Sequence, residues 1–325
     1  MIKDRKGAHK LAVLNPYKSV VQTFNIEKEG YLTGIKNISS IPNTLMHKLE
    51  KDGFVLHTID KKSTLAGRAV DTDLYNPITG NYMSGSSSGT AINVFAGIND
   101  LGIGNDGGGS VLAPAMCVNI IGFISRLIEQ NREMNLKPNT EGMSVPNSIG
   151  FMVRDREILL KAIQSSINIV PASDYGKVFS DKEYANIQSE VIPLLEDHTE
   201  RKELLPFVQA ILSKCDVLIK TEGPVDINGF GDSLFGHFDA RTKAIQQSAN
   251  KGYVRICNIA GASALCLPQK ELGMSTLLMC ESKEDKIAKM LKLAEYIKDE
   301  NGVINWINIV TENSIYKFKR VDDSE

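Results

Sequence analysis

Residues 85–114 constrain the fold of this chain more than any other stretch, and they read GSSSGTAINVFAGINDLGIGNDGGGSVLAP. Two loops of small residues, GSSSG and GNDGGGS, enclose an apolar segment at 90–98 and a short apolar run at 101–104. The first reads as a short buried helix and the second as a strand. The segment thus predicts a helix and a strand packed between two glycine-rich loops.

The flanking sequence alternates between helix and strand patterns, which indicates an α/β fold. The clearest example is an amphipathic helix at 43–52, with Asn43 as its N-cap, followed by Gly53 and a strand at 54–59. Further helices are expected near 155–164, 199–214 and 283–298, and further strands at 118–124, 216–220 and 277–280. The apolar stripe of the last helix is typical of core packing.

The chain is expected to form one domain over 1–325: a large twisted mixed β-sheet covered by α-helices on both faces. Apolar residues make up 42% of the sequence, enough for a sizeable core, and no long linker of proline and glycine divides it. The last residues, VDDSE at 321–325, are expected to be frayed.

Charge and cysteine content exclude several functional classes. The net charge is −2 with no dense basic run, so neither nucleic acid nor an anionic membrane is an expected partner. The five cysteines are odd in number and form no C-x-x-C pair, which favours a reducing compartment. No apolar signal core opens the chain and no run reaches 18 apolar residues. The expected location is the cytoplasm.

The histidine pattern argues against a metal site or a histidine-based triad. The five histidines form no H-x-x-x-H or H-E-x-x-H pattern, so neither metal nor cofactor is expected. No G-x-S-x-G elbow supports a Ser–His–Asp triad.

Each glycine-rich loop has a simpler interpretation when taken alone. GSSSG could be a flexible linker, but it runs directly into an apolar helix. GNDGGG could cradle a phosphate, but the lysine of a P-loop is missing, and no G-x-G-x-x-G opens a helix after a strand.

Together, the two loops resemble the amidase signature family, whose pattern is roughly G-G-S-S-G-G, a buried helix, and then G-T-D-x-G-G-S-I-R-x-P. On this resemblance Ser86 is the bridging serine and Ser110 the nucleophile, 24 residues apart as in the family. TGIKNIS places Lys36 where the family carries its catalytic lysine. CNIAGASALCLP, near the C-terminus, is similar to the family's N-x-A-G-x-P-A-x-x-x-P stretch, so the likeness covers most of 31–300.

The resemblance also has departures. Leu112 stands where the family has arginine, which removes an expected partner of Asp106, and Ser84 and Ser88 replace glycines. Asn37 replaces the usual aspartate after the lysine. Only 50 residues separate the lysine from the bridging serine, which suggests a more open or differently lined pocket.

The resemblance implies a serine acyl-enzyme mechanism for cleaving an amide bond. Lysine is a base only when neutral, and lowering its pKa from about 10.4 by ~3 units costs about 4 kcal/mol. Ser86 would pass the proton of Ser110 to Lys36, and in the family it sits on a cis peptide bond. The amides of Gly107, Gly108 and Gly109 would form the oxyanion hole. Asp106, Gly85 and Ser87 would support the site, and Cys117 is expected to be a small core residue.

Several functions stay open at this level. The resemblance fits a free-standing amidase acting on a small-molecule amide, an amidotransferase subunit that releases ammonia from glutamine, and an acyl transferase. A non-catalytic scaffold with the same fold is the alternative of another class. Substrate identity and assembly into a homo-oligomer are left open.

Overall fold

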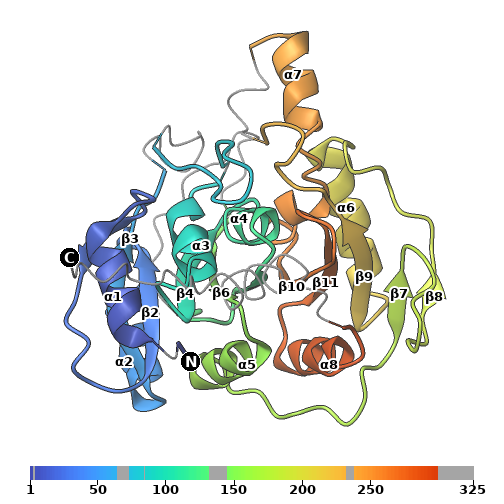
Figure 1. Ribbon diagram of the computed structural model, residues 1–325. Helices are drawn as coiled ribbons and strands as arrows, with labels where there is room; N and C mark the ends of the chain where they lie inside the picture. Colours follow the sequence, from blue (N-terminus) through green and yellow to red (C-terminus); the bar gives the residue numbers. More distant parts are fainter. Residues whose placement is uncertain (3, 64–72, 84, 132–144, 232–237, 299–325) are drawn as a thin grey trace, which may run out of the picture.

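The computed structural model describes residues 1–325 apart from 3, 64–72, 84, 132–144, 232–237 and 299–325 (Figure 1). The expected frayed tail and Ser84 therefore lie outside the described residues. The described helices are α1 (Arg5–Leu14), α2 (Asn43–Lys51), α3 (Ser88–Phe95), α4 (Leu112–Cys117), α5 (Arg156–Ser166), α6 (Arg201–Leu212), α7 (Ala240–Gln247), the 3-10 helix η2 (Tyr253–Arg255) and α8 (Glu284–Ala294).

One mixed sheet of 11 strands runs through the described chain, in the order β1-β3-β2-β4-β6-β5-β10-β11-β9-β7-β8. Its strands are β1 (Val20–Thr23), β2 (Tyr31–Lys36), β3 (Phe54–Asp60), β4 (Leu101–Asp106), β5 (Ile121–Ser125), β6 (Ser148–Val153), β7 (Val178–Ser180), β8 (Glu190–Val191), β9 (Val217–Glu222), β10 (Ala262–Pro268) and β11 (Ser275–Glu281). β2 pairs in parallel with β3 and β4, whereas β4, β6, β5, β10, β11 and β9 follow one another antiparallel.

Helices cover both faces of the sheet, so the expected α/β architecture is confirmed (Figure 1). One hydrophobic cluster joins α3, α4 and α6 to one face, and the other joins α2, α5 and α8 to the opposite face. Alternate residues of a strand enter different clusters, as with Leu218 and Ile219 of β9. Because helices bury both faces of the sheet, its strands have no solvent-exposed face and can be apolar throughout.

Most expected elements lie where their patterns place them, with two informative differences. Helix α2 begins at Asn43 itself and Pro42 is its N-cap, so Asn43 is not the cap. The strand expected at 118–124 starts only at Ile121, because the preceding residues form the short helix α4 and the turn after it. Cys117 ends α4 and is fully buried, as expected of a core residue.

The parallel trio β3-β2-β4 places three polar side chains at one edge of the sheet. Lys36, Asp60 and Asp106 are the last residues of β2, β3 and β4. Parallel strands end at the same edge, where ligands of open α/β sheets commonly bind. Both glycine-rich loops join this edge, since Ser86 and Ser87 lead into α3 and residues 107–111 connect β4 to α4.

Candidate functional site

The side chain of Lys36 is buried and reaches Ser86, as expected from the sequence. Only 2% of Lys36 is exposed, and its Nζ lies 2.5 Å from the Ser86 Oγ. A second contact, of 2.6 Å, joins Nζ to the Oδ1 of Asn105. The amine thus lies between one hydroxyl and one amide oxygen, with no carboxylate in ion-pair contact among the described residues.

Burial lowers the pKa of Lys36 to about 7, because the apolar surroundings disfavour the ammonium. The negative charge of Asp106 opposes this shift, and the positive charge of Lys62 adds to it. A large fraction of the lysine is therefore a neutral amine near neutral pH. A neutral amine can accept a proton, as a general base must.

Asn105 is a site residue that the sequence reasoning missed. It is the fifth residue of β4, buried, and its Oδ1 can only accept a hydrogen bond. One N–H of a neutral Lys36 therefore points at Asn105, which leaves the nitrogen lone pair free to accept from the Ser86 hydroxyl. A polar residue at the end of the apolar run LGIGND was the available signal.

The first loop turns at Gly85 and delivers Ser86 to the lysine. Gly85 has a φ of +123°, which disfavours any side chain there. Its carbonyl accepts a 2.7 Å hydrogen bond from the Ser88 hydroxyl, which gives this serine, a glycine in the family pattern, a local function. Ser87 is buried at the N-cap of α3. The cis peptide expected at Ser86 is absent, because the cis bond among the described residues is Gly223–Pro224.

The second loop comes close to the first at Ser110. A Cβ atom added to Gly85 would lie 2.7 Å from Pro114 Cγ and 4.0 Å from Ser110 Cα, so the first loop closely approaches the second loop and the start of α4. Ser110 is half-buried, and its hydroxyl makes no hydrogen bond within the described residues. The structure thus contains the Lys36–Ser86 contact, and a proton path from Ser110 to Ser86 belongs to the proposed mechanism below.

Asp106 organises the second loop from inside. Its fully buried carboxylate accepts hydrogen bonds from the backbone N–H groups of Gly109 at 2.7 Å, Val111 at 2.6 Å and Leu112 at 3.3 Å. Burial raises the pKa of Asp106, while these donors and Lys36 oppose the rise. Asp106 is thus bonded by backbone amides, and the Leu112 side chain, where the family pattern has arginine, packs in the core.

The Asp106 contacts correct one part of the expected oxyanion hole. The amide of Gly109 is directed at the Asp106 carboxylate and does not face a substrate oxygen. The amides of Gly107, Gly108 and Ser110 have no hydrogen-bond acceptor within the described residues. These three amides, all in the loop between β4 and α4, are the available donors.

Two further side chains border the glycine loop and were not foreseen from the sequence. Asn258 donates a 3.2 Å hydrogen bond from its Nδ2 to the Gly107 carbonyl. Arg201, the first residue of α6, brings a guanidinium nitrogen within 3.4 Å of where a Cβ of Gly108 would lie. A positive charge therefore stands beside the loop that carries Ser110.

No group of three or more metal-ligating side chains occurs within the described residues. His57 and His9 are in contact with each other, 3.2 Å apart, and burial lowers the pKa of His57. None of the helices in the described chain is both long and apolar enough to cross a membrane.

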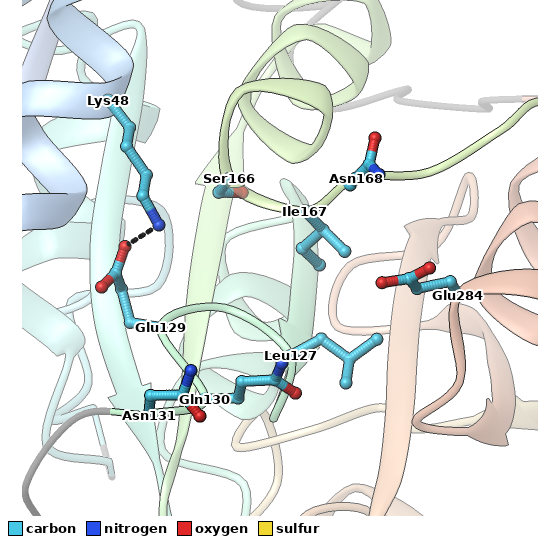
Figure 2. A pocket seen from close by; sticks show the side chains of 9 residues that line it. All are labelled: Lys48, Leu127, Glu129, Gln130, Asn131, Ser166, Ile167, Asn168 and Glu284. Atoms are coloured by element: carbon cyan, nitrogen blue, oxygen red, sulfur yellow. Dashed lines mark ion pairs between the residues drawn. The ribbon is translucent and has the colours of Figure 1, made fainter.

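A hollow of about 230 Å³ lies on the face covered by α2, α5 and α8, away from the lysine site (Figure 2). Lys48 and Glu129 form a 2.6 Å ion pair across one side of it. The Glu129 carboxylate also accepts from Thr44 at 2.9 Å. Glu284 also lines the hollow, whereas none of the expected catalytic residues does.

Comparison with known proteins matches residues 68–175, which contain both glycine-rich loops, to the family model described as Amidase. This part of the chain is therefore similar to the amidase family. Among curated amidase relatives, a glutamyl-tRNA(Gln) amidotransferase subunit of Methanothermobacter thermautotrophicus is 34% identical over 79 residues. The equivalent subunit of Methanosphaera stadtmanae is 31% identical over 80 residues. Each alignment covers 23% of this chain, and only 17% and 18% of the respective relatives.

Solved structures extend the amidase fold over nearly the whole chain. A glutamyl-tRNA(Gln) amidotransferase subunit from Thermotoga maritima superposes with a TM-score of 0.62 at 15% identity, covering 92% of this chain and 94% of that one. A crystal structure of an amidase gives 0.60 at 14% identity, with 91% and 94% covered. A 6-aminohexanoate cyclic dimer hydrolase gives 0.57 at 12% identity, with 92% and 96% covered. At these identities the likeness establishes the fold alone.

Replacing Lys36 by methionine should stabilise the protein most at low pH. The folded pKa of about 7 lies below the unfolded value of 10.5, so a buried ammonium costs up to about 5 kcal/mol below pH 7. This cost disappears as the pH rises from 7 to 10.5. The lost contacts with Ser86 and Asn105 reduce the gain but not its pH dependence.

Urea unfolding of wild type and Lys36→Met at pH 6, 8 and 9.5 tests this expectation. The free-energy advantage of the variant should shrink by about 1.4 kcal/mol per pH unit above pH 7. An advantage that does not change with pH would contradict the depressed pKa of Lys36.

Replacing Asn105 by aspartate should shift the pH dependence of activity in the alkaline direction. A carboxylate 2.6 Å from Nζ favours the ammonium and raises the pKa of Lys36, by roughly 1–3 units. Activity that requires the neutral amine then appears only at higher pH. The measurement is the pH profile of kcat/KM, with Ser40→Ala as the control because Ser40 contacts only the far side of the Asn105 amide.

Proposed function

We propose that this protein is an amidase that hydrolyses a small-molecule amide through an acyl-enzyme on Ser110. The single observation that carries the proposal is the buried contact between Lys36 and Ser86, beside the loop that bears Ser110. A buried lysine with a pKa of about 7 fits a general base and is unfavourable for stability alone. The similarity of residues 68–175 to the amidase family supports the same reaction class.

In the proposed reaction, the Ser110 Oγ attacks the amide carbonyl carbon. Its proton passes to the Ser86 Oγ as the Ser86 proton moves to the lone pair of Lys36. The C–N bond then breaks, and the leaving nitrogen takes the proton back along the same path. Water opens the resulting ester in the same way, releasing the acid and restoring Ser110.

The negative oxygen formed during attack requires hydrogen-bond donors. We assign this role to the amides of Gly107, Gly108 and Ser110, because the Gly109 amide already serves Asp106. Losing one such donor costs ~3 kcal/mol of barrier. Asp106 contributes indirectly, since its three backbone contacts hold the loop that presents these groups.

A glutamine-hydrolysing ammonia donor is the second candidate function. Its specific support is the local similarity to the glutamyl-tRNA(Gln) amidotransferase subunits of two organisms. Ammonia release from glutamine that rises when a co-purified partner is added would favour this candidate over a free-standing amidase. Acyl transfer to hydroxylamine in place of water would instead identify an acyl transferase. A non-catalytic scaffold would show none of these activities.

The proposed compartment is the reducing cytoplasm, on the basis that all five cysteines are free and buried. Burial raises the pKa of Cys117, Cys257 and Cys266, so these thiols are poor nucleophiles and none competes with Ser110.

A fluorophosphonate probe should label Ser110 and no other residue. Its phosphorus accepts an activated serine oxygen, so reaction requires the nucleophile and a working base. Ser110→Ala should abolish labelling, while Ser166→Ala should leave it unchanged, since this serine lines the hollow on the other face. Peptide mapping by mass spectrometry reads out the modified residue. Labelling that survives in Ser110→Ala would refute the assignment.

Ser86→Ala should impair amide hydrolysis more than ester hydrolysis. An amine leaving group must be protonated as the C–N bond breaks, whereas an alkoxide leaves with less help. We expect kcat/KM to fall by roughly 10²–10⁴-fold for an amide and by a clearly smaller factor for the matching ester. Equal losses for both substrates would mean that Ser86 does not carry the proton to the leaving group.

A further inference from the structure

A second buried carboxylate, Glu222, lies behind the glycine loop and has no counterpart in the mechanism above. Glu222 is the last residue of β9 and only 1% exposed. Its Oε1 accepts from the backbone N–H groups of Gly252 at 2.9 Å and Val254 at 3.0 Å, and its Oε2 from that of Tyr253 at 2.9 Å. Three consecutive amides thus converge on one carboxylate and fix the start of η2.

The segment held by Glu222 forms one wall of the loop that carries Ser110. A Cβ on Gly109 would lie 3.3 Å from the Val254 carbonyl oxygen and 3.6 Å from the Arg255 Cα. A Cβ on Gly108 would lie 3.5 Å from the Arg255 carbonyl oxygen. The loop and η2 therefore approach so closely that little room for a side chain remains between them, and a shift of η2 would alter the position of the loop.

The segment at 252–258 also binds the loop through a hydrogen bond. Asn258 donates to the Gly107 carbonyl at 3.2 Å, and its Oδ1 accepts from the Ser148 hydroxyl at 2.8 Å. Asp106 holds the loop from within, while the 252–258 segment supports it from outside. Both supports depend on a carboxylate that binds several backbone amides.

A cation on the same strand favours the charged form of Glu222. Lys220 lies two residues earlier, on the same side of β9, with its Nζ 4.0 Å from the Glu222 Oε2 and 2.7 Å from the Asp197 Oδ1. It also lies over the Tyr253 ring, 5.0 Å from the centroid. Burial raises the pKa of Glu222 to about 7, and the charge of Lys220 opposes that rise.

Ionisation matters because only the carboxylate is a pure acceptor. Protonated Glu222 would present an O–H to amide donors, and at least one of its three backbone contacts would be lost. The other groups that bear on its charge are Asp197, Arg255 and Tyr253 around η2 and the buried thiols of Cys257 and Cys266.

We infer that ionised Glu222, supported by Lys220, is a positioning residue that aligns the Gly107–Ser110 loop for attack and oxyanion binding. This inference rests on the proposed function of Ser110. Glu222 does not touch the reacting atoms; it acts through η2 and Asn258.

The test compares the rate of fluorophosphonate labelling at Ser110 in wild type, Glu222→Gln and Glu222→Asp at pH 8. Glutamine keeps the size but places an NH₂ group toward the amides, so labelling and kcat should fall by roughly tenfold to 100-fold, with KM little changed. Aspartate retains the charge and should recover part of the rate.

Asp216→Asn is the matched control, because it removes ion pairs with Lys286 and Lys289 at the opposite end of β9. It should lower stability but leave the labelling rate within about twofold of wild type, because this half-buried site lies away from the loop. A folded Glu222→Gln protein that labels at the wild-type rate would overturn the inference.

Lys220→Met provides a second test that keeps the carboxylate in place. Without the cation, the pKa of Glu222 rises, so the carboxylate becomes protonated earlier as the pH falls. Labelling should therefore be lost on acidification at a higher pH than in wild type. An unchanged pH profile would also overturn the inference. Absence of Ser110 labelling in wild type would instead refute the proposed function itself, so the two failures are distinguishable.

Discussion

Burial of the Lys36 amine is the interaction on which the rest of the site depends. An ammonium in this position would be costly, and the pKa of about 7 reflects that cost. Its two close contacts, Ser86 and Asn105, are neutral and therefore do not restore the charge. A carboxylate in either position would favour the ammonium and confine the action of the lysine as a base to higher pH.

The parallel strands explain how distant residues meet at this amine. β2 ends at Lys36 and β4 ends at Asp106, and the two strands pair directly in parallel. Ser86, which is 50 residues from the lysine in sequence, enters from the loop before α3. The sheet thus supplies a rigid edge, and each glycine-rich loop has only a short distance to span.

Sequence reasoning could identify the parts of this site that are local. Ser86 and Ser110 lie in two glycine-rich loops that are close in the sequence, so their spacing can be read directly. The helix and strand between the loops are predicted by two apolar runs. Lys36 was found only through its short flanking match, because a lysine ending a strand has no pattern of its own. Its burial, and its contact with Asn105, depend on how β2 pairs with β4, which no local pattern encodes.

Long-range hydrogen bonds account for what the sequence did not predict. The sequence DVLIK at 216–220 reads as a strand, but nothing in or after it indicates that Glu222 meets amides about 30 residues later. The role of Gly109 was misjudged for the same reason. Three consecutive glycines suggested three equivalent donors, but the carboxylate at the end of β4 claims one of them. The run of glycines allows the backbone amides of the loop to converge, whereas the Asp106 side chain determines which of these amides remain available to a ligand.

The two buried carboxylates also explain how a loop this rich in glycine can be rigid. Glycine loses the most conformational freedom on folding, so an unsupported run of it would sample many shapes. Asp106 binds three backbone amides of the loop and its exit, and Glu222 binds three of the neighbouring wall. Each carboxylate must be ionised to accept from all three, although burial disfavours the charge. The same low-polarity surroundings also favour the neutral form of Lys36, which lowers its pKa where the pKa of an acid would rise. The proposed chemistry therefore requires two buried acids to be charged and one buried base to be neutral. Hydrogen bonding distinguishes the two cases. Asp106 and Glu222 accept from converging amide donors, whereas the Lys36 amine contacts only neutral groups, which can bind either its charged or its neutral form.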